Sequence, residues 1–270
     1  MKDMGFRKFK KYLQIFLQLQ RINLMKRMSY PVSFIMSCST VLLTMVLSLL
    51  FINVSFSFMD NLAGWTYYQM LAVVGSYMII ECIMWAFFGQ LNAINFHIME
   101  GTMDGILLKP IDDQFLASFW RGDPEDFMRL ITGSALVVVS IENTIGLDFL
   151  NLSLFLFLIF NGTVILYSFN LIVRSVSFWV IDGSGLWLLM ERVTSNSQFP
   201  VDIYYNKIVR GALTYIIPLA FVATVPAKIL TNRDIDFQLV ELSFVMAIFF
   251  FFVSRYFWKF SLKHYSSASS

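Results

Sequence analysis

The chain has 270 residues and a formal net charge of +2; 57% of its residues are hydrophobic, 17% are aromatic and only 14% are charged. An ordinary soluble domain carries about 25% charged residues, so this composition excludes a soluble globular protein and indicates an integral membrane protein. The length allows about six spanning helices of about 20 residues each and leaves no room for a large soluble domain. Cys38 and Cys82 lie in apolar stretches without a CxxC or CxxH neighbour, so neither a disulfide framework nor a zinc site is expected.

Residues 1–29 are expected to form an amphipathic helix in the cytoplasmic interface of the membrane. Apolar side chains recur at three- and four-residue spacing, namely Phe6, Phe9, Leu13, Phe16, Leu17, Leu24 and Met28. The remaining positions are rich in basic residues, namely Lys2, Arg7, Lys8, Lys10, Lys11, Arg21, Lys26 and Arg27. The positive-inside rule therefore places this end in the cytoplasm. The same pattern also fits a helix packed on another protein domain.

A permease domain of six transmembrane helices is predicted for residues 30–265, followed by a short tail, residues 266–270. The expected spans are residues 30–58, 66–93, 130–146, 149–173, 175–190 and 237–258. Basic residues after the last apolar run place the C-terminus in the cytoplasm as well, and two cytoplasmic ends require an even number of spans.

The even count decides how residues 200–230 are interpreted. Residues 211–227 are apolar but contain Pro218 and Pro226, so they fit either a complete span or a re-entrant pair of half-helices. Six other spans make the segment re-entrant on the outer side. The alternative is that the short third or fifth segment is the one that does not cross.

Residues 94–129 form the one long polar interruption and are expected to be a cytoplasmic loop. Gly101 and Gly105 allow tight turns, residues 106–108 offer a short apolar face, and Lys109 with Pro110 ends any helix there. A short helix at the membrane surface fits this pattern, and a solvated connection is the alternative. A merely solvated loop has no need of an apolar triplet, so a partner is expected to pack on it. The excess of acidic residues in the loop could suit a basic docking surface.

Two acidic residues fall inside predicted spans. Glu81 lies near the middle of the second span, and Asp182 lies about midway along the fifth. An isolated ionised carboxylate at that depth costs at least about 2.5 kcal/mol, so both side chains are expected to face the interior of the bundle. They would either line a substrate pathway or make structural hydrogen bonds with neighbouring spans.

Motifs for chemistry on this chain are missing. The sequence contains no GxxxxGK[ST] phosphate loop, so this chain alone is not expected to hydrolyse ATP. Neither GxSxG nor HExxH occurs, and the two histidines, His97 and His264, lie outside the predicted spans. An enzyme is therefore not expected.

These features together resemble the membrane subunits of type 2 ATP-binding-cassette exporters. The resemblance spans nearly the whole chain and rests on the basic N-terminal helix, the loop motif from Gly101 to Pro110, Phe178 with Trp179, and residues 214–218 before Pro226. It implies an all-α, six-span, multi-pass protein of the plasma membrane that dimerises with an identical or a related permease chain. It also implies a separate cytoplasmic ATPase that carries the ATP and Mg²⁺, with no cofactor on this chain.

The resemblance further implies that a short coupling helix after the second span docks on the ATPase. The residues that match it are Gly101, Thr102, Asp104, Gly105, Ile106, Leu107, Leu108, Lys109 and Pro110. It does not indicate the substrate. A membrane-embedded scaffold or enzyme without an ATPase partner is the alternative function.

Overall fold

The computed structural model describes residues 2–144, 146, 148–180, 184–233 and 236–265, and this part of the chain is helical without any β-strand. The all-helical architecture predicted from the sequence is confirmed. The longer helices are α1 (Lys2–Met28), α2 (Pro31–Ser57), α3 (Tyr67–Phe88), α7 (Phe127–Glu142), α8 (Phe149–Ser175), α9 (Ser184–Ser195) and α12 (Phe237–Leu262). The shorter ones are η1 (Gly89–Ala93), α4 (Ile94–Met99), α5 (Asp104–Leu107), α6 (Asp113–Phe119), η2 (Pro124–Asp126), η3 (Val176–Phe178), η4 (Asn196–Gln198), η5 (Val201–Ile203), α10 (Lys207–Tyr215), η6 (Leu219–Phe221) and α11 (Thr224–Leu230).

Four helices of the described chain are long and apolar enough to cross a membrane. They are Pro31–Ser57, Tyr67–Met99, Phe149–Phe178 and Phe237–Leu262, and each covers one of the predicted spans. The predicted third span corresponds to α7, with 16 residues, whereas the predicted fifth span, residues 175–190, takes in η3 and only the first part of α9, a helix of 12 residues. Both are shorter than the about 20 residues that cross a bilayer without tilt or thinning. The count of six spans therefore stays a prediction.

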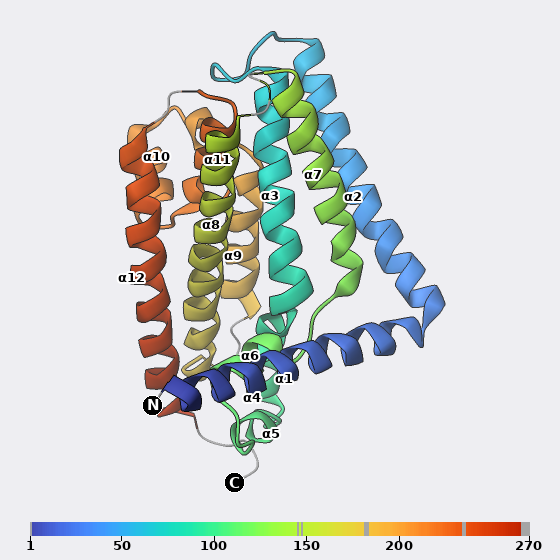
Figure 1. Cartoon of the computed structure of the whole chain (residues 1–270), viewed down its shortest axis with the longest axis vertical. Helices are drawn as coiled ribbons and strands as arrows, with labels where there is room; N and C mark the ends of the chain where they lie inside the picture. The colour runs from blue at the N-terminus through green and yellow to red at the C-terminus, as the bar shows by residue number, and fades with distance from the viewer. Residues whose placement is uncertain (1, 145, 147, 181–183, 234–235, 266–270) are drawn as a thin grey trace.

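The segment between α9 and α12 is bent. Helix α10 and the following η6 and α11 meet at an angle of 70°, at Pro218, whose ring removes the backbone donor that a continuous helix needs. Figure 1 shows α10 and α11 together at the end of the bundle opposite α1. This arrangement is compatible with the predicted re-entrant pair and with one broken span.

Helix α3 lies in the middle of the bundle and packs closely against α7. A Cβ atom added to Gly75 would lie 2.8 Å from the carbonyl oxygen of Gly133, and one added to Gly133 would lie 2.9 Å from that of Gly75. The two helices therefore touch backbone to backbone at a point where only glycine fits. Helix α8 approaches η6 in the same way, because a Cβ on Gly162 would lie 2.5 Å from the carbonyl oxygen of Phe221.

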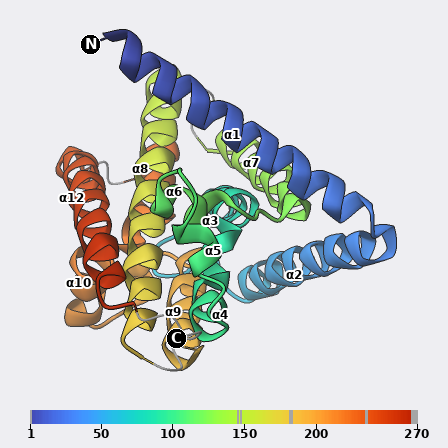
Figure 2. The ribbon, with the colours of Figure 1, turned by 90° about the horizontal axis from the view of Figure 1, so that it is seen from below.

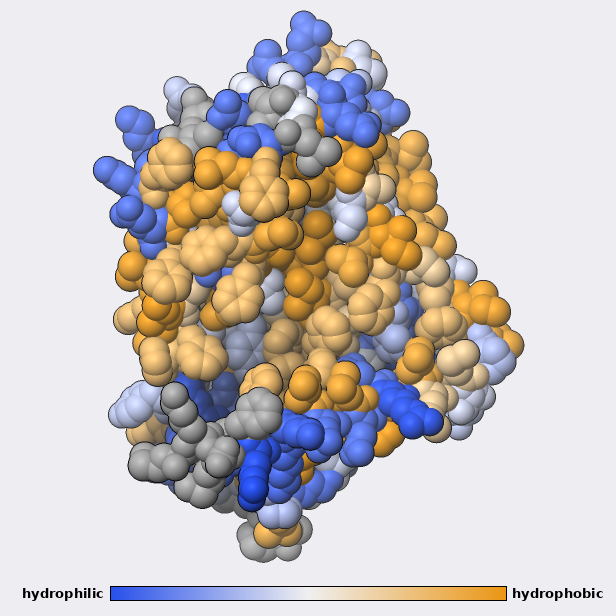
Figure 3. All heavy atoms as spheres, viewed as in Figure 1, coloured by the Kyte–Doolittle hydropathy of each residue, from blue (hydrophilic) through white to orange (hydrophobic). Residues whose placement is uncertain are grey.

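Helix α1 crosses one end of this bundle, as Figures 1 and 2 show from two directions. A short turn at Ser29 and Tyr30 joins it to α2, which begins at Pro31. Proline is favoured at the first helical position because its missing N–H would have no partner there. Figure 3 shows, on one face, an apolar band between two hydrophilic ends. This distribution of side chains suits a protein that spans a bilayer.

The contact between α3 and α7 gives a stability prediction. Gly133→Ala forces a methyl group against the backbone of α3, and we expect a loss of about 1–3 kcal/mol in the free energy of unfolding. Gly211→Ala is the matched control, because no atom lies within 4 Å of the added Cβ. Thermal unfolding in detergent measures both, and equal melting temperatures for Gly133→Ala and wild type would contradict the prediction.

The bent segment gives a topology prediction. In a chain with Cys38 and Cys82 replaced by serine, single cysteines at Tyr205 and Gln238 flank the bend at exposed positions. If the segment re-enters, both cysteines react with a membrane-impermeant thiol reagent added from outside. Labelling of one cysteine from outside and of the other only after the membrane is permeabilised would show that the segment crosses.

Candidate functional site

Residues 94–126 do not form an open loop. They fold into the short helices α4, α5, α6 and η2, which lie together at the α1 end of the bundle (Figures 1 and 2). The turn after α4 needs the glycine that the sequence places there, since Gly101 has a φ of +66°, in the left-handed region that side chains disfavour.

A histidine holds this turn in place. The Nδ1 atom of His97 lies 2.7 Å from the Thr102 hydroxyl, and its Nε2 atom lies 2.8 Å from the side-chain nitrogen of Gln90. Because that amide nitrogen is a donor, the His97 Nε2 atom accepts and the Nδ1–H donates to Thr102. The imidazole therefore ties the loop to η1, a role that the sequence analysis did not assign to it.

The apolar triplet expected to form one docking face is divided by the fold. Ile106 is buried together with Met103, and Leu107 packs partly against the same cluster, whereas Leu108 is 86% exposed. The predicted common outward face is therefore wrong for Ile106, because α5 is a single turn that must bury one side to stay attached. Leu108 is the member of the triplet that projects away from the protein.

The other predicted loop residues precede or follow this exposed leucine in the chain. Asp104 and Gly105 begin α5, and a Cβ on Gly105 would meet no atom within 4 Å. The ammonium of Lys109 lies 3.3 Å from the centre of the Trp120 ring, which fixes the chain just before Pro110. Gly105, Leu108 and Pro110 are all exposed on this loop.

Helix α1 packs on this loop through one face. The Tyr12 hydroxyl accepts a hydrogen bond of 3.1 Å from the backbone N–H of Asp112. The rings of Tyr12 and Phe115 lie 4.9 Å apart, and those of Phe16 and Phe119 lie 5.2 Å apart. A second apolar stripe of α1 stays exposed, namely Phe9, Leu13, Leu17, Leu24 and Met28. The helix therefore contacts the chain's own loop with one face and leaves another for the membrane or a partner.

The acidic residues before α7 point inward. Asp123, Glu125 and Asp126 are each less than 9% exposed. Arg27 of α1 forms ion pairs with Asp123 and, at 3.1 Å, with Glu125. Arg129 of α7 lies 3.2 Å from Asp126. These three carboxylates therefore serve internal contacts, and the expectation that the loop's acidity suits a basic docking surface is wrong for them.

Glu81 belongs to the same group of charges. Its carboxylate accepts a hydrogen bond of 2.6 Å from the Nη1 atom of Arg129. The sequence alone does not show a partner for Glu81, because Arg129 falls in the polar stretch before the predicted third span. In the structure α7 begins at Phe127, so Arg129 lies in its first turn and reaches α3.

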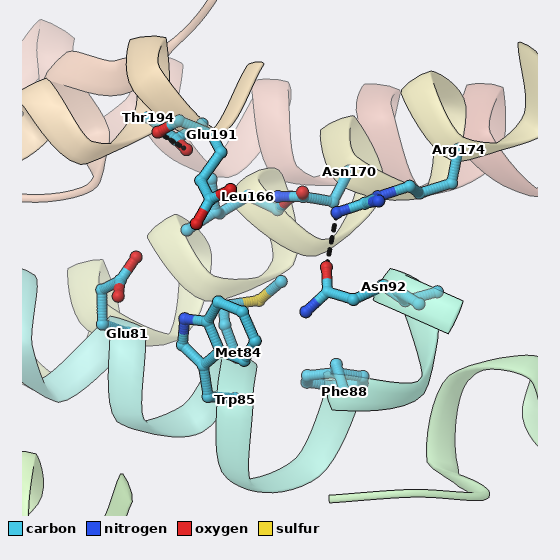
Figure 4. Close-up of a pocket in the computed structure, with 11 residues that line it drawn as sticks. Glu81, Met84, Trp85, Phe88, Asn92, Leu166, Asn170, Arg174, Glu191 and Thr194 are labelled. Carbon is cyan, nitrogen blue, oxygen red and sulfur yellow. Dashed lines mark hydrogen bonds between the residues drawn. The ribbon is translucent and has the colours of Figure 1, made fainter. Parts of the chain in front are cut away.

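A polar pocket lies beside Glu81, between α3, α8 and α9 (Figure 4). Its charged and amide lining consists of Glu81, Asn92, Asn170, Arg174 and Glu191. The Arg174 guanidinium is buried and donates to the Asn92 side chain. Asp182, the other predicted interior acid, lies outside the described residues. The pocket carries charges of both signs, and within the described chain no cluster of three metal-ligating side chains occurs.

The buried cluster gives a pH prediction. Burial raises the pKa of the Asp126 carboxyl from 3.8 to about 7, although Arg129 opposes the shift. The folded protein then binds more protons than the unfolded chain between these pH values, so stability falls as the pH rises through that window. Asp126→Asn removes this pH dependence. We therefore expect the melting temperature of the variant, relative to that of wild type, to rise between pH 5 and pH 8. Glu100→Gln, at an exposed acid of the same loop, is the control; an Asp126→Asn difference that does not change with pH would contradict the prediction.

Comparison with known protein families identifies the family to which this chain belongs. Residues 42–269 match the family described as ABC-2 family transporter protein. The matched region runs from within α2 to the end of the described chain and includes the whole α4–α6 loop and the polar pocket, with α1 outside it. A search of curated proteins found no match. Because the family model covers more than half of the chain, the protein belongs to the ABC-2 family of transporter proteins and is a multi-pass membrane permease of an ATP-binding-cassette transporter.

Proposed function

We propose that this permease works in an exporter, as one of two permease chains that enclose the translocation pathway and bind two copies of a separate cytoplasmic ATPase. Family membership supports an ATPase partner. The chain has no phosphate loop of its own, so ATP and Mg²⁺ bind on the partner. Both termini lie in the cytoplasm in this proposal, as the basic α1 favours.

The observation that carries the proposal is the exposed tip of the α4–α6 loop. Leu108 is 86% exposed although it is apolar, and Met99 at the end of α4 is 52% exposed. Apolar side chains that stand exposed at a polar end of a membrane protein favour a protein partner over water. The ATPase docks on this tip, with α1 as a second contact.

The loop is built to pass on a displacement. Its turn is tied to η1 by His97, and its base is joined to α1, α3 and α7 by the buried ion pairs. When ATP draws the two ATPases together, the loop moves as a rigid unit and shifts the spans between two packed arrangements. Glu81 connects this base to the polar pocket, which we place on the substrate pathway.

Leu108→Asp tests the docking role. The side chain is outside the core, so insertion and folding should stay normal, whereas burying an unpaired carboxylate in an interface costs several kcal/mol. We expect copurification of the ATPase to fall by at least about tenfold, as a loss of about 1.4 kcal/mol already gives. Single replacement is preferable to changing Leu107 as well, because Leu107 packs on the core.

Tyr205→Asp is the matched control, since Tyr205 is fully exposed at the opposite end of the molecule. It should leave copurification unchanged. Wild-type copurification with Leu108→Asp would remove the docking role of this residue. A wild-type subunit that brings down no polypeptide with a phosphate loop would favour the scaffold function.

A further inference from the structure

Helix α6 is fastened to the last spanning helix by an arginine. Arg255 of α12 grips the Asp112 carboxylate with both terminal nitrogens, with 2.9 Å between Nη1 and Oδ1. The same Nη1 atom donates a hydrogen bond of 2.6 Å to the side-chain oxygen of Gln114. One turn farther along α12, the indole N–H of the buried Trp258 lies 3.4 Å from Asp113. The first turn of α6 is therefore held from one side by α12.

Gln114 also joins α6 to α8. The Gln114 amide donates a hydrogen bond of 3.0 Å to the hydroxyl of Tyr167, which lies 2.8 Å from the Ser118 hydroxyl. Tyr167 is buried, and its ring lies 4.6 Å from that of Phe88 on α3. A continuous polar chain thus runs from α12 through α6 to α8.

Asp112 is the point where these contacts meet. It caps α6 by accepting a hydrogen bond of 3.0 Å from the backbone N–H of Phe115, and its own N–H donates to Tyr12 of α1. The Arg255 guanidinium beside it lowers the pKa of the Asp112 carboxyl. The carboxylate therefore stays ionised, and paired with Arg255, at pH values where an ordinary aspartate would be protonated. A planar guanidinium bound through two nitrogens also fixes orientation, which a lysine ammonium does not.

We propose that Arg255 is a positioning residue through which movement of the α4–α6 loop is passed to α12. The inference rests on the proposed coupling of this loop to an ATPase. It adds a second route beside the buried acidic cluster: that cluster connects the loop with α1, α3 and α7, whereas Arg255 connects it with α12. Without the guanidinium, the loop still binds the ATPase, but α12 no longer follows it.

The partial exposure of the Arg255–Asp112 pair distinguishes a role in transmitting movement from a role in folding stability. The side chains of Arg255 and Asp112 are each 31% exposed, and partly exposed ion pairs contribute little to folding stability. Removing the pair should therefore leave the yield of folded complex unchanged. A large effect on motion with a small effect on yield is what the proposal requires.

The experiment uses the permease in complex with its ATPase and two fluorescent probes. One probe is attached to a cysteine replacing Phe96 on α4, and the other to a cysteine replacing Tyr256 on α12; these side chains are 60% and 73% exposed. In the wild-type background both probes should change their emission when ATP is added. With Arg255→Gln, we expect the α4 response and ATP hydrolysis to persist, while the α12 response falls by at least about fivefold, the lower end of typical coupling factors.

Three further variants sharpen the result. Lys259→Gln removes a positive charge one turn along α12 and should keep both responses. Asp112→Asn keeps the helix cap and should have the same effect as Arg255→Gln. If Arg255→Gln lowers the yield of folded complex, Asp112→Asn takes its place in the experiment. The exchange Asp112→Arg with Arg255→Asp restores an ion pair and should restore part of the α12 response.

The outcomes are distinguishable. Equal α12 responses in wild type and Arg255→Gln, with the α4 probe still responding, would overturn the role of Arg255 and leave the proposed function standing. A wild-type complex in which neither probe responds to ATP, or from which the ATPase is absent, would overturn the proposed function and this inference with it.

Discussion

The structure depends on the pairing of buried charges where α1, α3 and α7 meet. Carboxylates taken out of water are tolerated only when cations and hydrogen-bond donors replace the water. Arg27 is the cation that pairs with Asp123 and Glu125, and Arg129 is the cation that pairs with Asp126 and Glu81. The backbone at Gly122 packs directly against α3, because a Cβ added to Gly122 would lie 1.9 Å from the carbonyl oxygen of Ala86. Only glycine allows the acidic stretch to lie against α3.

This constraint holds the polar loop against the bundle. Its base is fixed by ion pairs, its turn by His97, and α6 by Arg255 and Tyr167. Leu108, at 86% exposure, is the most exposed apolar side chain of this loop. A loop fastened to several helices at once passes a displacement to all of them, whereas a mobile loop would absorb it. These contacts support the proposed coupling function.

Glu81 connects the buried charges with the polar pocket. Its carboxylate binds Arg129 and also lines the space between α3, α8 and α9. A shift of α7 that moved Arg129 would therefore change the charge presented to the pocket. The two roles considered for Glu81, structural contact and pathway lining, are compatible in this geometry.

The sequence by itself determined the membrane class, the transporter family, the four long apolar helices, the start of α2 at Pro31 and the glycine turn at Gly101, because composition, hydropathy and backbone preference are local properties. It predicted a third and a fifth span where the structure has helices of 16 and 12 residues, since hydropathy does not show where a helix ends. Only the tertiary structure decided that Ile106 is buried while Leu108 is exposed, and which acid meets which arginine. Three of those ion pairs, Arg27–Asp123, Arg129–Glu81 and Arg255–Asp112, join residues 96, 48 and 143 positions apart. A one-dimensional pattern carries no information about which distant side chains a fold brings within reach.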